Sequence, residues 1–136
     1  MRDVAYVALG SNLGDRDAYL RLARERIAAL PGARVIAESA VDETAPIGPQ
    51  GQGAYLNQMV AVETDLAPAA LLAALQAIEH EAGRERTVRW GARTLDLDIV
   101  LFARQRVDEP GLQVPHPQLP HRDFWRRQLA ALGVAA

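Results

Sequence analysis

Hydrophobic and polar residues follow two different periods along the chain, and these periods predict its elements. The continuous apolar run Val4–Leu9 is typical of a buried strand. Apolar residues spaced three and four apart predict one helix after Asp15, a candidate N-cap, and a second helix that begins at Pro68. The apolar stripes of these two helices consist of Leu20, Ala23, Ile27 and Leu30, and of Leu71, Leu75, Ile78 and Ala82.

Strand patterns account for most of the remaining chain. Arg34–Val41 and Tyr55–Val62 have strand character, and in Leu95–Leu101 apolar residues alternate with aspartate. We expect Val107–Gln113 to be a polar connector and Phe124–Leu132 to form a last helix. The order β-α-β-β-α-β predicts an α+β fold of the ferredoxin-like type. Its antiparallel sheet would carry two helices on one face and be followed by a short C-terminal extension.

Composition indicates one globular domain over residues 1–136. The chain is 49% hydrophobic and 24% charged, and no apolar run approaches the roughly 20 residues of a membrane-spanning helix. Cysteine is absent, which excludes disulfides, thiolate metal sites and a cysteine nucleophile. We expect a cytoplasmic protein without a membrane partner. We also expect a monomer, because the chain is large enough to bury its own core.

The charged residues restrict how the chain can bind phosphate. A net charge of −2 and a pI of about 5.9 argue against a dedicated nucleic-acid-binding protein. All 15 basic residues are arginine, so the lysine that a P-loop requires is missing, and no Rossmann glycine fingerprint occurs. Any phosphate chemistry must therefore rest on arginine, metal ions and backbone amides.

Asp96 and Asp98 are the strongest candidates for chemistry. At i and i+2 of a strand they project from the same face with Cα atoms roughly 7 Å apart, and their charges repel unless a cation lies between them. A pair of Mg²⁺ ions bridged by carboxylates and substrate phosphates is one such cation. Guanidinium groups that suit phosphate and an indole that suits a flat ring lie just upstream. These residues are Arg84, Arg86, Arg89, Arg93 and Trp90.

Each of these features also has a structural interpretation. One interpretation is that the aspartates form the charged face of an edge strand that discourages aggregation, but the neighbouring arginines favour a nucleotide–Mg²⁺ site. Asn57 beside Tyr55 is consistent with binding of a heterocycle or with an ordinary half-exposed strand face. His116, in a proline-rich frame, is a surface residue or a catalyst. Gln76 and Glu79 lie on a polar helix flank, which is solvated unless the helix borders the site.

Five motifs in consistent order resemble the 6-hydroxymethyl-7,8-dihydropterin pyrophosphokinase family, from about Val4 to Phe124. The most specific motif is R-W-G-x-R-T-L-D-L-D-I, over residues 89–99. The other four are G-S-N-L-G at 10–14, T-x-P-x-G at 44–48, Y-L-N at 55–57 and V-P-H at 114–116. The resemblance implies an enzyme of folate biosynthesis that transfers diphosphate from ATP to the pterin hydroxymethyl group and releases AMP.

The resemblance also implies a role for each matching residue. Asp96 and Asp98 would bind two Mg²⁺ ions, and Arg84 and Arg93 would be catalytic phosphate-binding residues. Trp90 would stack on the pterin. The ATP side would consist of Gln76, Glu79, Arg84, Arg86, Trp90, Arg93, Ile99, His116 and Arg122. The pterin side would consist of Thr44, Pro46, Ile47, Tyr55, Asn57, Trp90, Asp96 and Phe124.

The chain also departs from the family pattern. Pro117 follows the histidine, and the Pro-Leu-x-Glu tail is replaced by Gln-Leu-Ala-Ala at 128–131, which we expect to affect packing behind Phe124. These departures leave open a nucleotide-binding paralogue that has lost the transfer activity. A non-catalytic RNA-binding module of the same fold is a further alternative, but an aromatic content of 5% and the acidic pI argue against it.

Overall fold

A computed structural model describes residues 2–45, 54–83 and 94–134. It is a mixed structure with an antiparallel sheet, which confirms the predicted α+β class. In chain order the elements are β1 (Asp3–Ser11), α1 (Arg16–Ala28), β2 (Ala33–Glu38), β3 (Asp42–Thr44), β4 (Tyr55–Thr64), α2 (Pro68–Glu81), β5 (Asp96–Phe102), β6 (Val107–Glu109), β7 (Leu112–Val114), the 3₁₀ helix η1 (Leu119–His121) and α3 (Asp123–Ala131).

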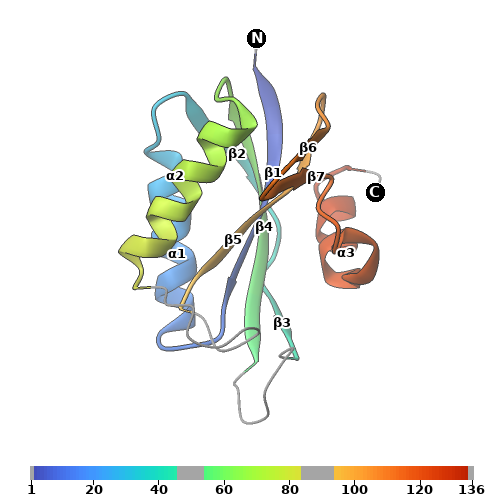
Figure 1. The fold of residues 1–136 in the computed structure, drawn as a ribbon. Coiled ribbons are helices and arrows are strands. Elements are labelled where there is room, and N and C mark those ends of the chain that lie inside the picture. The colour runs from blue at the N-terminus through green and yellow to red at the C-terminus, as the bar shows by residue number, and fades with distance from the viewer. Residues whose placement is uncertain (1, 46–53, 84–93, 135–136) are drawn as a thin grey trace.

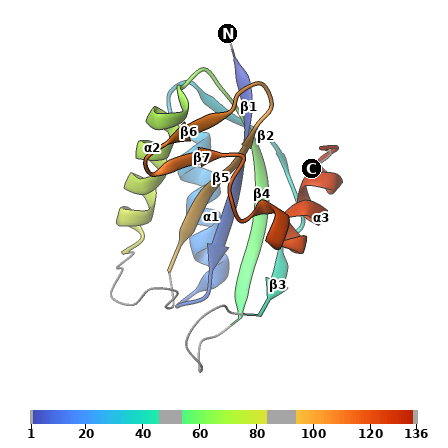
Figure 2. The same cartoon turned by 45° about the vertical axis from the view of Figure 1, so that its right-hand side comes forward.

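The main sheet has the strand order β2-β4-β1-β5, and β3 also pairs with β4. All of these pairs are antiparallel. Helices α1 and α2 cover one face of the sheet and α3 covers the other (Figures 1 and 2). The central strands β1 and β4 are covered on both faces, and accordingly residues 4–9 of β1 and 59–62 of β4 are continuous apolar runs.

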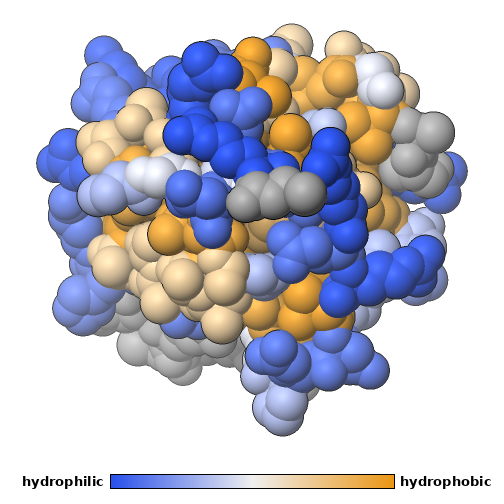
Figure 3. Space-filling view, turned by 90° about the horizontal axis from the view of Figure 1, so that it is seen from above, coloured by the Kyte–Doolittle hydropathy of each residue, from blue (hydrophilic) through white to orange (hydrophobic). Residues whose placement is uncertain are grey.

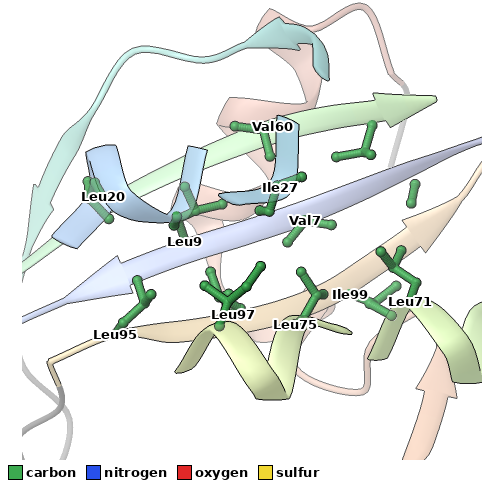
Figure 4. Close-up of a cluster of buried hydrophobic side chains, with 14 of the residues drawn as sticks. Val7, Leu9, Leu20, Ile27, Val60, Leu71, Leu75, Leu95, Leu97 and Ile99 are labelled. Carbon is green, nitrogen blue, oxygen red and sulfur yellow. The ribbon is translucent and has the colours of Figure 1, made fainter. Parts of the chain in front are cut away.

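Two hydrophobic clusters hold these layers together. The larger one lies between the sheet and helices α1 and α2 (Figure 4), and it contains the predicted apolar stripes of both helices. The smaller one lies between the sheet and α3, where Ala8, Met59 and Val100 pack with Trp125 and Leu129. Because successive strand residues alternate between faces, the sheet contributes different side chains to the two clusters.

The predicted starts of α1 and α2 are confirmed, whereas α1 ends at Ala28, before Leu30 of its predicted stripe, and α3 spans Asp123–Ala131 rather than residues 124–132. The Asp15 carboxylate accepts a hydrogen bond from the Ala18 amide at 3.1 Å and so caps α1. Pro68 is the first residue of α2, and Gly83 follows that helix with φ +77°, a value that favours glycine. Arg26 of α1 donates to both carboxylate oxygens of Glu81 at 2.9 and 2.7 Å, and this hydrogen bond and charge raise the pKa of Arg26.

Two predictions about strands were wrong. The predicted strand Arg34–Val41 was too long, because β2 ends at Glu38 and a separate short strand, β3, begins only at Asp42. Between them the Ser39 hydroxyl accepts a hydrogen bond from the Met59 amide. The predicted connector Val107–Gln113 belongs to the β6–β7 hairpin, in which Gly111 has φ +81°. Each hairpin strand has only three residues, so the alternation of buried Leu112 and Val114 with exposed Gln113 was too short to be recognised.

The surface contains both hydrophilic and hydrophobic residues. Figure 3 shows hydrophilic and hydrophobic residues interspersed at the end of the molecule that is uppermost in Figure 1. Within the described residues, the large hydrophobic side chains that are exposed are Leu13, Ile36 and Val41. Within residues 2–45, 54–83 and 94–134, no helix is long and apolar enough to cross a membrane.

Candidate active site

Asp96 and Asp98 lie on β5, which is an edge strand of the main sheet. Asp96 pairs with Gly10 and Asp98 with Ala8, while the intervening Leu97 packs into the core between the sheet and the first two helices. The two carboxylates therefore share the face that α3 covers, and both are half-buried. Two like charges on one partly desolvated face favour a bound cation.

A row of side chains crosses the sheet beside Asp96. Asp42, Asn57, Gly10 and Asp96 are successive partners on β3, β4, β1 and β5. Directly opposed residues in antiparallel strands project from the same face, so all four belong to the α3 face. A methyl group on Gly10 would lie 3.3 Å from Asn57 Oδ1 and 3.5 Å from the Tyr55 ring. Glycine at position 10, the floor between Asn57 and Asp96, thus avoids crowding the Asn57 carboxamide and the Tyr55 ring.

Asn57 is held by its neighbours across the strands. It is 7% exposed, and its side-chain amide donates to Thr44 Oγ1 at 2.5 Å. Thr44 in turn pairs with Tyr55, the first residue of β4. The predicted pterin-side residues Thr44, Tyr55 and Asn57 therefore lie together on β3 and β4, next to the floor at Gly10.

His116 lies beside Asp98, with Nε2 3.6 Å from Asp98 Oδ1. The Gln118 amide donates to His116 Nδ1 at 3.0 Å, so the ring proton of a neutral His116 is on Nε2, the atom that faces the carboxylate. The chain reaches this position because the His116 amide bonds to the Val100 carbonyl at 2.9 Å, which fixes the segment after β7 alongside β5.

Trp125 of α3 connects three of the predicted site residues. The His116 ring meets it edge-on with centroids 5.0 Å apart, and the Phe124 ring meets it at 6.2 Å with an interplanar angle of 71°. The Arg122 guanidinium lies 4.4 Å from the centre of the indole. Trp125 is 1% exposed, so it forms a rigid support under these three side chains.

Comparison with known proteins gives the same result as the motifs. The model of the 7,8-dihydro-6-hydroxymethylpterin-pyrophosphokinase (HPPK) family matches residues 6–133. A 2-amino-4-hydroxy-6-hydroxymethyldihydropteridine pyrophosphokinase of Bacillus subtilis is 45% identical over 97% of this chain and 79% of its own length. Proteins of the same name from Pseudomonas aeruginosa and Pseudomonas putida are 47% and 49% identical, over 93% and 82% of this chain and 78% and 92% of their own lengths.

The chain belongs to the HPPK family. The predicted enzyme class is thereby confirmed, and a pyrophosphokinase of folate biosynthesis is favoured over an RNA-binding module. The described residues of this HPPK bring Asp96, Asp98 and His116 together, with Asn57 and Thr44 across the sheet. Six predicted site residues lie outside the described part of the chain: Pro46, Ile47, Arg84, Arg86, Trp90 and Arg93.

The structure locates the remaining ATP-side predictions on or next to the opposite face of β5. Gln76 is exposed on α2. Glu79 is 6% exposed and accepts a hydrogen bond from the Leu97 amide at 2.8 Å, so the expectation of a solvated Glu79 was wrong. The Ile99 side chain is 3% exposed in the larger core cluster, so a ligand on the Asp98 face would reach Ile99 only through its main chain.

Sequence reasoning missed three residues that shape this HPPK site. Gly10 was seen only as part of a turn motif, because a glycine in a strand gives no signal of what it leaves open. Trp125 was not singled out, because an aromatic residue in a C-terminal helix is usually a core residue. Arg16 donates to Glu43 at 3.0 Å and to the Ala54 carbonyl at 2.8 Å, joining α1 to the strands of Thr44 and Tyr55.

Proposed function

We propose that this HPPK transfers the diphosphate of ATP to the hydroxymethyl oxygen of 6-hydroxymethyl-7,8-dihydropterin on the α3 face of the sheet. The observation that carries the proposal is the row of Asn57, Gly10 and Asp96 across three strands, with Asp98 one step along β5. In this proposal Asn57, at one end of the row, would hydrogen-bond the heterocycle, and the carboxylates would act at the other end. The two substrates would meet there.

The carboxylates suit Mg²⁺, because hard oxygen ligands are what this ion prefers. Among the described residues no group of three or more histidine, cysteine or acidic side chains is arranged to hold a metal. Two carboxylates are nevertheless sufficient where substrate phosphates and water complete the coordination, the usual arrangement for Mg²⁺ in kinases. Asp96 and Asp98 would hold two ions. Bound Mg²⁺ would supply neutralisation of the phosphate charge and a lowered pKa for the substrate hydroxyl.

On the pterin side, Asn57 would read the amide-like edge of the ring through its side-chain carbonyl, since its amide group donates to Thr44. Phe124, half-buried against Trp125, would cover one face of the ring, and Trp90 would cover the other. Tyr55, Pro46 and Ile47 would complete the subsite.

On the ATP side, Arg122 and His116 would bind the nucleotide from the segment that follows β7. Arg84, Arg86 and Arg93 would hold phosphate oxygens, and Arg84 and Arg93 would stabilise charge as it develops. Gln76, Glu79, Ile99 and Trp90 would complete this side. The hydroxymethyl oxygen would attack the β-phosphorus in line, and AMP would leave from the opposite side. Positioning and charge neutralisation would provide most of the rate enhancement.

Further properties belong to the same proposal. The strand order β2-β4-β1-β5 supports the ferredoxin-like βαββαβ topology, with β3 and the β6–β7 hairpin as additions. The chain would act as a single domain over residues 1–136 and as a cytoplasmic monomer, with small molecules rather than nucleic acid as its partners. Two buried hydrophobic clusters within one chain support the monomer.

The deciding experiment is an end-point assay with ATP, Mg²⁺ and 6-hydroxymethyl-7,8-dihydropterin that resolves AMP from ADP. We expect AMP in step with a diphosphorylated pterin, and loss of both products in Asp96→Ala. ADP as the product would contradict attack at the β-phosphorus. Bound ATP without any turnover would indicate the degenerate paralogue instead.

Replacing His116 by alanine is expected to raise the KM for ATP by roughly tenfold and to leave the pterin KM within about twofold. The reason is that one hydrogen-bonding group beside Asp98 is lost while the β3–β4 side of the site is untouched. Steady-state kinetics with each substrate varied in turn provides the measurement. His121→Ala, an exposed histidine of η1, is the matched control and should change neither constant. A larger effect on the pterin KM than on the ATP KM would contradict the assignment of His116 to the ATP side.

A further inference from the structure

Gln128 is a buried polar residue of α3 that contacts the site strands directly. It is 3% exposed, and its side-chain nitrogen Nε2 donates to Asp42 Oδ2 at 3.0 Å and to the Asn57 carbonyl at 3.3 Å. Asp42 and Asn57 are themselves partners in the β3–β4 pair. The side-chain amide of this one α3 residue therefore hydrogen-bonds to both strands, at two residues that are directly paired.

One of these two hydrogen bonds is to the main-chain carbonyl of Asn57, whose side chain we propose to bind the pterin. The Asn57 side chain bonds to Thr44, two residues after Asp42 on β3. The helix that carries Gln128 also carries Phe124, one turn towards its N-terminus. Gln128 thus links the helix that presents the aromatic ring to the strands that present the amide.

The two contacts require a hydrogen-bond donor. A carboxylate oxygen and a carbonyl oxygen both accept, and the NH₂ group of glutamine has two hydrogens to give. Glutamate of the same shape would place a carboxylate against Asp42 and the Asn57 carbonyl, and leucine would leave both acceptors without this donor. Among the described residues Gln128 Oε1 has no hydrogen-bond partner, so these two donations are the polar contacts that hold the side chain there.

A glutamine on the opposite face of β4 offers an internal comparison. Gln58 is 5% exposed, accepts from Arg24 at 2.8 Å and donates to the Ser39 carbonyl at 2.8 Å. It is the chain neighbour of Asn57 but belongs to the α1 and α2 side of the sheet. Removing Gln58 therefore costs a similar set of buried hydrogen bonds without touching the α3 face.

We propose that Gln128 is a positioning residue for the pterin subsite. By fixing α3 against Asp42 and Asn57, it sets the Phe124 ring and the Asn57 amide at the separation and orientation that the flat pterin ring requires. This inference rests on the proposed placement of the pterin beside Asn57. It assigns Gln128 no contact with the substrate and no effect on the ATP side.

The test is steady-state kinetics of the full chain with pterin and ATP varied separately, together with thermal unfolding. Gln128→Glu and the uncharged, similarly shaped Gln128→Met are each expected to raise the pterin KM about tenfold, with the ATP KM changed less than twofold. Adding Asp42→Asn to Gln128→Glu should recover part of the pterin KM, because an asparagine amide can donate to the new carboxylate. Asp42→Ala, a change at a half-buried strand position, should give a smaller rise of the same kind. Gln58→Leu should lower the melting temperature but leave both KM values unchanged.

Several outcomes would overturn the proposal. If the Gln128 variants and Gln58→Leu all lower the melting temperature and none changes the pterin KM, Gln128 only stabilises the fold. Equal increases in both KM values would show a general distortion instead. Should the Gln128 variants not fold, an unchanged pterin KM in Asp42→Ala would count against the proposal. Asn57→Ala separates this from failure of the subsite itself. If Asn57→Ala also leaves the pterin KM unaltered, the placement of the pterin is wrong. If Asn57→Ala raises the pterin KM and the Gln128 variants do not, only the role of Gln128 is overturned.

Discussion

Asp98→Ala is expected to lower kcat by about 10³-fold or more while the affinity for the pterin falls less than about threefold. Asp98 shares the α3 face with Asp96 and lies 3.6 Å from His116, but the pterin-side residues Asn57 and Thr44 are two and three strands away. A metal ligand acts chiefly on charge that develops in the transition state, worth several kcal/mol, and each ~1.4 kcal/mol is a factor of ten in rate. Turnover by AMP release and pterin affinity by calorimetric titration give the two numbers.

The same experiment includes its own controls. Asp98→Asn keeps the shape but removes the charge, so it should lose nearly as much activity as alanine if charge on the metal is what matters. Asp108→Asn neutralises an exposed carboxylate of β6 and should behave like the unmodified protein. Equal losses of pterin affinity and turnover in Asp98→Ala would contradict the assignment of Asp98 as a metal ligand.

Gly10→Val is expected to weaken pterin binding by between about 10- and 100-fold, with Gly10→Ala showing a smaller effect. Already a methyl group would approach Asn57 Oδ1 to 3.3 Å, and valine adds two methyl groups on the floor between Asn57 and Asp96. Inserting atoms into a closely packed site costs about 1–3 kcal/mol, and here the side chain also occupies the proposed position of the ring. Titration of the protein with pterin measures the loss.

A stability control separates obstruction of the site from damage to the sheet. Ala37→Val adds the same two methyl groups to the half-buried edge strand β2, away from the α3-face row, and should leave pterin affinity unchanged. The melting temperature of each variant is recorded alongside. Unaltered pterin affinity in Gly10→Val would show that the ring does not lie over Gly10.

The sequence predicted the long elements well because each has a strong internal period. The stripes of α1 and α2, the cap at Asp15 and the apolar runs of β1 and β4 all reflect local patterns that do not depend on distant residues. The break at Ser39 and the β6–β7 hairpin were missed because pairing with another segment decides them. The Met59 amide satisfies Ser39, and the burial of Leu112 and Val114 against the larger core makes a strand of three residues.

In the candidate site, too, some features follow from the local sequence and others from the tertiary structure. Two aspartates at i and i+2 of a strand necessarily share a face, so the sequence alone determined that Asp96 and Asp98 lie on the same face. The motifs that indicate the family are likewise a property of the sequence. Which residues face them was decided by the tertiary structure. The registers of β1 with β4 and β5 bring Asn57, Gly10 and Asp96 into one row across three strands. The packing of α3 brings Trp125 under His116 and Arg122, and Gln128 onto Asp42 and Asn57. Contacts such as that between residues 42 and 128 depend on strand pairing and helix packing, which no local period encodes.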